Sequence, residues 1–232
     1  MSFFSIDGRV FETLPRLCVG VVLAEGVRGA VPHPGVDGML DAAVRDAEAR
    51  LDGAHASDDP RVQPYRAAFH ELGMSPSRYP SSNIALLRRI AKGKGLWRVN
   101  PVVDLGNAIS IKHGLPLGAH ALEEGEVLEL RFSRPGDVFV ALGEGEPDPT
   151  LAPGELVYAV GELVHTRRWT WRQSENGKVD PAATRVAFPI DGFTDENEAE
   201  VRAACEELAE VLRNEFGARA EVFLADARSP RV

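Results

Sequence analysis

Arginine and tryptophan alternate in the segment HTRRWTWRQ, which is the least ordinary stretch of the chain. On an extended strand Trp169 and Trp171 share one face, with Arg167 in the same row, while Arg168 and Arg172 lie on the other face. An arginine beside a tryptophan permits stacking or cation–π contact, and its fork suits a carboxylate or a phosphate. The pattern fits a binding surface and, equally, an edge strand with an aromatic anchor in the core and a charged outer face.

A cluster of cations forms the second feature that could do chemistry. Arg88, Arg89, Lys92, Lys94 and Arg98 fall within about three helical turns' length of chain, interrupted by two glycines and a tryptophan in RRIAKGKGLWR. Cations beside an aromatic ring and flexible glycines suit a phosphate or a nucleotide base. The other interpretation, which the sequence alone favours, is a solvated helix end whose basic residues complement the helix dipole.

Polar residues within the apolar segment NPVVDLGN form the third feature. Asp104 and Asn107 are three residues apart, so a helix places them on one face, and Asn100 precedes that helix. Half-buried polar groups must be hydrogen-bonded or they become costly. The favoured interpretation is structural, with Asn100 as a cap and the other two holding the following loop. The alternative is that they contact a ligand.

The sequence offers only weak candidates for catalysis, because no GxSxG, P-loop, HExxH or CxxC pattern is present. His113 is better placed than His120, but a general base needs a partner, and a loop or cap histidine is the favoured interpretation. Asn100 and Gln173 are the candidate groups for polarising a carbonyl.

The charge balance limits the partners. A net charge of −9 and a pI near 5.2 exclude broad coating of nucleic acid, which needs a wide basic surface, but not contact with the end of an RNA. The longest apolar run, Leu17–Ala24, is far shorter than the roughly 20 residues that span a bilayer, and MSFFSIDGRV lacks the pattern of a signal peptide. Cys18 and Cys205 lack metal-ligand spacing. We expect a cytoplasmic protein without metal, cofactor or membrane contact.

These residues must be positioned by several helices and short strands. Apolar spacing predicts helices over Val36–Leu51, Val62–Leu72, Asn83–Ala91, Val102–Lys112 and Glu196–Phe216. The expected caps are Asp59, Ser81 or Ser82, Asn100 or Pro101, and Thr194. Strands are predicted over Phe3–Ile6, Leu17–Leu23, Val127–Phe132, Asp137–Ala141, Leu156–Val160, Leu163–Trp171, Arg185–Ile190 and Ala220–Leu224. Since no repeat or long linker divides the chain, we expect residues 1–232 to form one domain of the α+β (mixed α/β) class.

Taken in order, several motifs resemble a known family. They are PSSNIALLRRIAKGKGLWRVNPVVDLGNAISIKHGLPLG, a GEVLELRF strand, and GELVYAVGELVHTRRWTWRQSENGKV. This succession, from about Tyr65 to Asp191, resembles the B3/B4 domain of bacterial phenylalanyl-tRNA synthetase β subunits. The RRWTWRQ block is most similar to free-standing relatives of that domain. The resemblance implies a B3/B4-like module with antiparallel or mixed sheets flanked by helices.

The resemblance also implies a pocket, which in the synthetase hydrolyses wrongly attached tyrosine from tRNA. Such a reaction needs a water held against an ester, donors for the developing oxyanion, and a cavity for the amino acid. The matching wall segments are Asn100–Gly118 and Trp169–Val179. The synthetase's pocket glutamate falls near Phe188–Pro189, where this chain has no acid, and its histidine position falls on Gly118.

Three functions from different classes follow, and all depend on the NPVVD helix and the RWTWR strand forming one cleft. The leading one is a free-standing editing-type (ester hydrolysis) or aminoacyl-recognising domain at the tRNA acceptor end; if catalytic, it is an aminoacyl-tRNA deacylase. The alternatives are a non-catalytic module for an amino acid or small anionic metabolite, and a protein-interaction domain anchored by an exposed tryptophan. The predicted substrate- or RNA-binding residues are Arg88, Arg89, Lys92, Asp104, Asn107, Arg167, Arg168, Trp169, Trp171 and Arg172.

Overall fold

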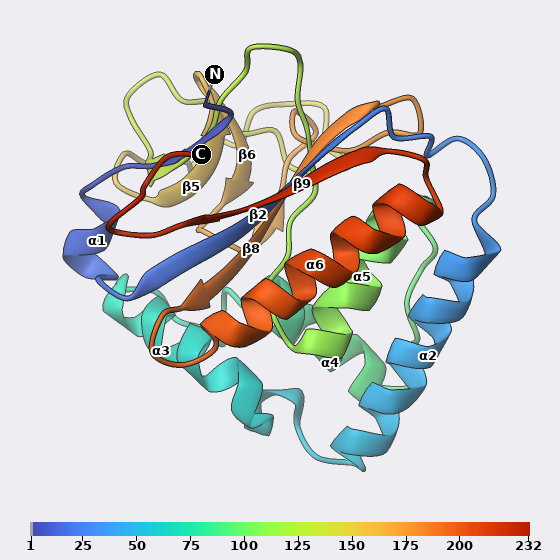
Figure 1. The fold of residues 1–232 in the computed structure, drawn as a ribbon. Helices are drawn as coiled ribbons and strands as arrows, with labels where there is room; N and C mark the ends of the chain where they lie inside the picture. Colours follow the sequence, from blue (N-terminus) through green and yellow to red (C-terminus); the bar gives the residue numbers. More distant parts are fainter. Residues whose placement is uncertain (1) are drawn as a thin grey trace.

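Two β-sheets form the centre of the computed structural model, which describes residues 2–232 (Figure 1). The four-stranded sheet is antiparallel and has the order β3 (His120–Ala121), β8 (Arg185–Phe193), β2 (Leu17–Glu25), β9 (Arg219–Ala225). The five-stranded sheet has the order β1 (Phe4–Ile6), β4 (Leu128–Phe132), β5 (Leu156–Val160), β6 (Leu163–Arg167), β7 (Arg172–Gln173). It is mixed, because β1 pairs with β4 in parallel and the other pairs are antiparallel.

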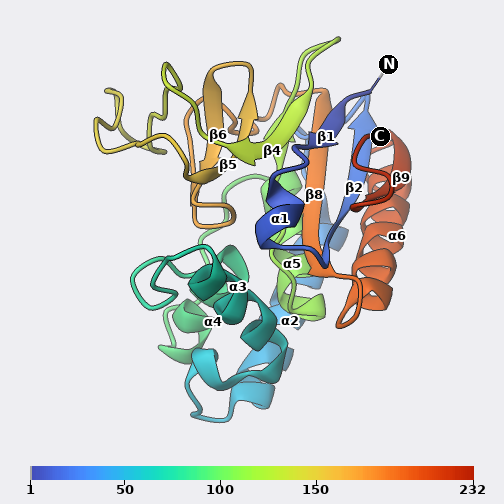
Figure 2. The same cartoon turned by 90° about the vertical axis from the view of Figure 1, so that its left-hand side faces the viewer.

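The helices cover the four-stranded sheet and extend below both sheets. They are α1 (Val10–Thr13), α2 (Pro34–Leu51), α3 (Gln63–Glu71), α4 (Ser82–Ala91), α5 (Pro101–His113) and α6 (Glu198–Asn214), with short 3₁₀ turns at Ala56–Asp58 and Pro60–Val62. Helix α6 packs on β2 and β9, while α5 contacts both α6 and α2. Figure 2 shows α3 and α4 beneath the sheets, with β5 and β6 on one side and α6 on the other. The α+β class predicted from the sequence is confirmed.

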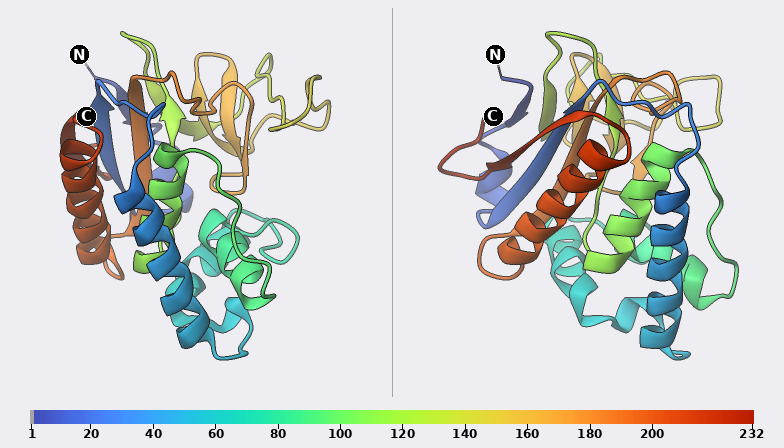
Figure 3. Two further views of the ribbon diagram at one scale, coloured as in Figure 1. Left: turned by 90° about the vertical axis from the view of Figure 1, so that its right-hand side faces the viewer. Right: turned by 45° about the vertical axis from the view of Figure 1, so that its right-hand side comes forward.

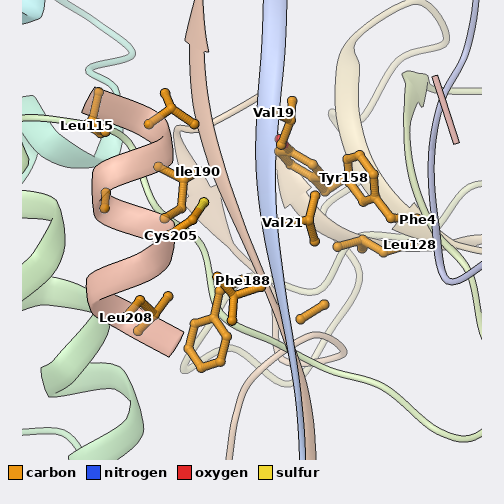
Figure 4. Close-up of a cluster of buried hydrophobic side chains, with 14 of the residues drawn as sticks. Phe4, Val19, Val21, Leu115, Leu128, Tyr158, Phe188, Ile190, Cys205 and Leu208 are labelled. Atoms are coloured by element: carbon orange, nitrogen blue, oxygen red, sulfur yellow. The ribbon is translucent and has the colours of Figure 1, made fainter. Parts of the chain in front are cut away.

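Strand β2 lies at the centre of the core, which explains its continuous apolar run. One face of its sheet presents Phe188 and Ile190 to helix α6, and the other presents Val19 and Val21 to the five-stranded sheet (Figure 4). A strand buried on both faces has no solvent side and therefore lacks polar alternation. Gly20 is required here, because a Cβ at this position would lie 2.4 Å from the Cys205 sulfur.

Most predicted elements are confirmed with shifts of a few residues, but one predicted strand is wrong. Residues Asp137–Ala141 form only isolated bridges at Val138 and Ala141 and no continuous strand. Of two predicted helix caps, one is confirmed and one is wrong. Asn100 accepts hydrogen bonds from the amides of residues 102 and 103 and caps α5 as predicted, whereas Thr194 lies too far from α6, which begins at Glu198.

The predicted strand Leu163–Trp171 is also shorter than expected, because β6 ends at Arg167. Arg168 and Trp169 then adopt positive φ angles of 50° and 60°, in the left-handed region that non-glycine residues rarely occupy. Tertiary contacts hold this turn, since the Trp169 amide donates to the carbonyl of Leu156 and its indole lies in the core. Trp169 and Trp171 therefore do not share one strand face.

None of the helices among residues 2–232 has the length and hydropathy required to cross a bilayer.

Candidate functional site

A cavity of about 330 Å³ lies where α5, strand β3 and the turn between β6 and β7 meet. Its apolar walls are Val99, Val103, Leu117, Ala119, Leu142, Trp169, Trp171 and Val179. Its polar lining includes Ser82, Asn107, His120, Tyr158, Thr166, Thr170, Arg172, Gln173, Lys178 and Asp191. The structure thus brings the NPVVD helix and the RWTWR segment together around one cleft, although the second segment is a turn and not a strand.

Asp191 is a fully buried carboxyl group in the lining of this cavity. Its Oδ1 accepts hydrogen bonds from the Tyr158 hydroxyl and the Trp169 indole, each at 2.7 Å. No hydrogen bond to Oδ2 is present among residues 2–232. Burial raises the pKa of Asp191 to about 7, although both hydrogen bonds act in the opposite direction. Near neutral pH this carboxyl can therefore accept a hydrogen bond or donate one.

His120 is fully buried next to the same cavity, and neither of its ring nitrogens has a hydrogen-bond partner within residues 2–232. Its ring stacks on that of His165 and lies against Tyr158, with centroids 5.6 Å away in both cases. Burial lowers the pKa of His120 well below its usual value, so the imidazole is neutral. A neutral imidazole has one donor and one acceptor, and here both are unused.

Space for a ligand beside His120 is provided by Gly118. A Cβ at residue 118 would lie 2.7 Å from Nε2 of His120, so a larger residue would close the approach to this nitrogen. The hydroxyl of Thr170 is also buried and has no partner in the described part of the chain. Buried polar atoms are nearly always hydrogen-bonded, so unpartnered ones in a cavity lining indicate a place for a polar ligand or water.

Of the predicted residues in the NPVVD segment, only Asn107 lines the cavity. Asn100 is engaged in the helix cap, and its amide donates to the carbonyl of Val179 at 3.0 Å. Asp104 is buried and accepts from the Val99 amide at 3.0 Å, and burial raises its pKa. Both therefore have structural roles: Asn100 caps the helix as predicted, whereas Asp104 holds the connection before the helix and not the loop after it.

The weak catalytic candidates occupy two different places. His113 lies outside the cavity, with Nδ1 2.5 Å from Glu200 and Nε2 2.8 Å from Glu207, where it links α5 to α6. Gln173 does line the cavity, but its side chain bonds Thr166, the carbonyl of Ala119 and the carbonyl of Gly177. The geometry gives His113 a role in joining helices and gives Gln173 a role in holding the cavity wall.

The arginines of the RRWTWRQ block are divided between core and surface. Arg167 is fully buried in ion pairs with Asp148 and Glu155, both at 2.7 Å, so it is not available to an RNA phosphate. Arg168 packs over the ring of Tyr79 at 4.1 Å and lies outside the cavity. Arg172 lines the cavity and pairs with Glu144 at the surface.

The two tryptophans of this block also differ in their surroundings. Trp169 is fully buried and packs near Tyr65 and Phe69, so it is both a core residue and part of the cavity wall. Trp171 is half-buried, lines the cavity and meets Tyr79 edge-on at 5.0 Å. A protein-interaction surface that uses both rings is thereby excluded.

The predicted basic cluster lies near the end of α4, outside the cavity lining. The guanidinium of Arg89 lies 3.5 Å from the centre of the Trp97 ring. Arg88 makes one long contact to the carbonyl of Ser77, and Lys92 is exposed.

Sequence reasoning missed the polar inner end of the cavity, formed by His120, Tyr158, Thr170 and Asp191. A usable signal existed for Asp191, because it is the only charged residue after the first position of the apolar strand RVAFPIDGF. No such signal marked His120, whose strand β3 is only two residues long. No group of three or more His, Cys, Asp or Glu side chains in residues 2–232 is arranged to hold a metal ion.

The family described as "B3/4 domain" matches residues 64–219. The chain therefore belongs to the B3/4 domain family. No protein of curated function matches it. Among solved structures, the chain is similar to an N-terminal fragment of the phenylalanyl-tRNA synthetase β subunit from Pyrococcus horikoshii, with 9% identity and a TM-score of 0.47. This similarity covers 94% of the chain and 49% of the fragment, so the chain spans about half the length of that structure.

Proposed function

We propose that the cavity recognises the aminoacyl group of a charged tRNA and that the chain is a free-standing, editing-type domain. The observation that carries this proposal is the cavity of about 330 Å³ with unpartnered polar groups at its buried end. Its size is at the lower end of the roughly 300–1,000 Å³ of small-molecule sites, which suits an amino-acid side chain. Membership of the B3/4 domain family supports the link to tRNA synthetases.

The burial of the lining residues indicates which end of a ligand enters the cavity first. His120 and Asp191 are fully buried, whereas Val99 and Leu142 are exposed and the half-buried Arg172 lies beside them at the mouth. A ligand that remains attached to a tRNA must enter with its side chain first. Asp191 and His120 would then bind the tip of that side chain, so the preferred amino acid carries a hydrogen-bonding group there.

In this orientation the ester lies toward the mouth, and the half-buried Asn107 of the lining is the group that would contact it. No hydrogen bond to the Asn107 side chain is present in the described residues, so its amide can donate to the ester carbonyl. Attack by water on the carbonyl carbon forms a tetrahedral oxyanion, which such a donor stabilises. Collapse breaks the bond to the ribose oxygen, which takes up the proton lost by the water, and releases the free amino acid.

The proposal is tested by deacylation of a panel of mischarged tRNAs with the wild-type chain and a filled-cavity variant. Val103→Trp places a large side chain in the cavity wall, and Val31→Trp, at an exposed position, is its matched control. We expect one class of charged tRNA to be hydrolysed by the wild type and the control but at least tenfold more slowly by Val103→Trp. Equal rates in all three proteins, or no hydrolysis of any tRNA, would contradict editing.

A second function, recognition of a free amino acid without catalysis, is favoured because arginines of the RRWTWRQ block already form ion pairs within the chain. Arg167 is buried in ion pairs, and Arg172 is paired with Glu144 at the cavity mouth. Thermal-shift measurements distinguish the two functions, since a ligand at 100 times its dissociation constant stabilises the folded state by about 2.7 kcal/mol. The second function would be favoured if a free amino acid raises the melting temperature of the wild type but not of Val103→Trp, and if no charged tRNA is hydrolysed.

A further inference from the structure

Trp97 is the most exposed large apolar side chain among residues 2–232, with 72% of its surface accessible. It lies in the connection between α4 and α5, which runs along the outside of the helices (Figure 3). Arg89 covers one face of the indole, with its guanidinium carbon 3.5 Å from the ring centre, and its Nε donates to the carbonyl of Gly95. The ring is therefore held by one face while most of its surface is open.

The surroundings of Trp97 are basic in a chain whose net charge is −9. Residues 88–98 contain five cations and no acid. Within residues 2–232, Lys92 and Lys94 make no ion pair, whereas Arg98 pairs with Asp37 and Asp41. The two lysines are thus free to meet anionic groups, and the positive charge is local.

The connection also leads directly to the cavity. Val99, only two residues after Trp97, is 63% exposed and lines the cavity mouth. Two residues of extended chain span about 7 Å, so one flexible ligand can reach both the indole and the cavity. A patch that joins an open aromatic ring, free lysines and a cavity mouth suits single-stranded nucleic acid, whose bases stack and whose phosphates bind cations.

We propose that Trp97, backed by Arg89, stacks a base near the 3′ end of a single-stranded RNA, with Lys92 and Lys94 on the adjacent phosphates. The group attached to that end enters the cavity past Val99. This inference deepens the proposed function and rests on it for the identity of the attached group, but the stacking surface itself lies outside the cavity. It makes Trp97 and the two lysines the RNA-binding residues, in place of the buried Arg167.

The test is the fluorescence anisotropy of a labelled, uncharged 12-nucleotide RNA that ends in CCA, titrated with the full chain at several salt concentrations. Removing a stacked base contact weakens single-strand binding by about fivefold to 150-fold, so we expect at least a fivefold loss for Trp97→Ala and partial recovery for Trp97→Phe. The control is Val31→Ala at another exposed apolar position. Equal affinity of Trp97→Ala and wild type, or no binding by the wild type, overturns the proposal, and retained RNA affinity would point to a protein partner for Trp97.

The lysines are tested by the double substitution Lys92→Gln and Lys94→Gln. Each phosphate contact to a single strand contributes about 0.7 to the slope of log affinity against log salt, so we expect the slope to fall by about 1.4. Arg202→Gln with Arg219→Gln, at two exposed positions, should leave the slope unchanged. An unchanged slope in the lysine variant contradicts phosphate contact at these positions.

The filled cavity separates this inference from the proposed function. Val103→Trp should bind the uncharged RNA as tightly as the wild type, because the stacking surface does not include the cavity. If the wild type binds the RNA but neither deacylates any charged tRNA nor shows a thermal shift with an amino acid, the stacking inference stands and the proposed function is wrong. If Trp97→Ala keeps both its deacylation activity and its RNA affinity, the proposed function stands and the stacking inference is wrong.

Discussion

The chain buries charged and polar groups in two regions, and these regions differ in whether the buried groups have hydrogen-bond partners. In the five-stranded sheet, Arg131 and Arg167 are among the largest fully buried side chains, and each is surrounded by acceptors. Arg131 makes two hydrogen bonds to Asp137, at 2.7 and 2.9 Å, and others to Glu129 and two carbonyls. At the inner end of the cavity, by contrast, His120 lacks partners within residues 2–232 for both ring nitrogens.

The difference distinguishes buried polar groups that hold the fold together from buried polar groups that remain available to a ligand. A buried charge with complete hydrogen bonding has nothing left to offer a ligand, so Arg167 belongs to the architecture although it lies in the most suggestive sequence motif. An unpartnered buried atom is costly unless something else binds it, and it therefore points to a ligand or to water. Substitutions in the two regions should accordingly change stability in opposite directions.

The largest effect is expected for Asp137→Asn in the five-stranded sheet. The side chains of Arg131 and Asp137 are 0% and 2% exposed, so the substitution leaves a buried guanidinium with a weaker set of partners. Removing one member of a buried ion pair typically costs about 3–5 kcal/mol, and we expect a loss in this range by urea denaturation at pH 7.

The matched control for that prediction is Asp195→Asn, which removes the same charge from an exposed pair with Arg16. An exposed pair is screened by solvent, so this variant should unfold like the wild type. Similar losses of unfolding free energy in both variants would show that the buried pair stabilises the fold no more than the exposed pair does. The contrast between the five-stranded sheet and the cavity would then not hold.

The buried carboxyl group of the cavity should make the free energy of unfolding depend on pH. Burial raises the pKa of Asp191 from 3.8 to about 7, so between these values the folded protein retains a proton that the unfolded chain loses. The contribution of Asp191 to stability therefore falls as the pH rises, by about 1.4 kcal/mol per pH unit, and becomes constant above pH 7.

Asp191→Asn removes this dependence and should be more stable than the wild type at pH 8, while the two proteins converge toward pH 4. The measurement is the free energy of unfolding of both proteins at each pH, because their difference cancels the titration of other groups. A difference that does not change between pH 4 and 8 would mean that Asp191 ionises as an exposed carboxyl does.

The sequence predicted the elements of the fold well because their apolar patterns are local. Helices such as Val36–Leu51 and strands such as Leu17–Leu23 contain the residues that they bury, and α2 and β2 differ from them only at the ends. The strand expected at Asp137–Ala141 failed because β-prone residues there pack as a loop held by isolated bridges. Hydrophobic pattern alone does not distinguish a buried loop from a buried strand.

The location of the cavity was predicted, but the polar groups at its inner end were not. A cavity walled by Asn100–Gly118 and Trp169–Val179 was expected from the resemblance to the B3/B4 family, yet its polar inner end depends on Asp191 and His120, which come from two different strands. Burial and the absence of a partner are tertiary properties that no local pattern records. The positive φ angle of Trp169 is likewise set by its contacts in the core.

The smallest effect, and the sharpest contrast with the ion pairs, is expected for His120→Phe. Phenylalanine has a similar shape and removes two unpartnered polar atoms, each of which costs free energy in the folded state, so we expect a gain of about 1 kcal/mol by urea denaturation. The same substitution at His33 is the control, because that buried ring already has a partner: its Nε2 lies 2.8 Å from the carbonyl oxygen of Arg28. Leaving that carbonyl without its partner should cost about 1–3 kcal/mol. A loss of stability in His120→Phe as large as in the control would mean that the imidazole is already satisfied, and the cavity would then resemble the ion-paired sheet.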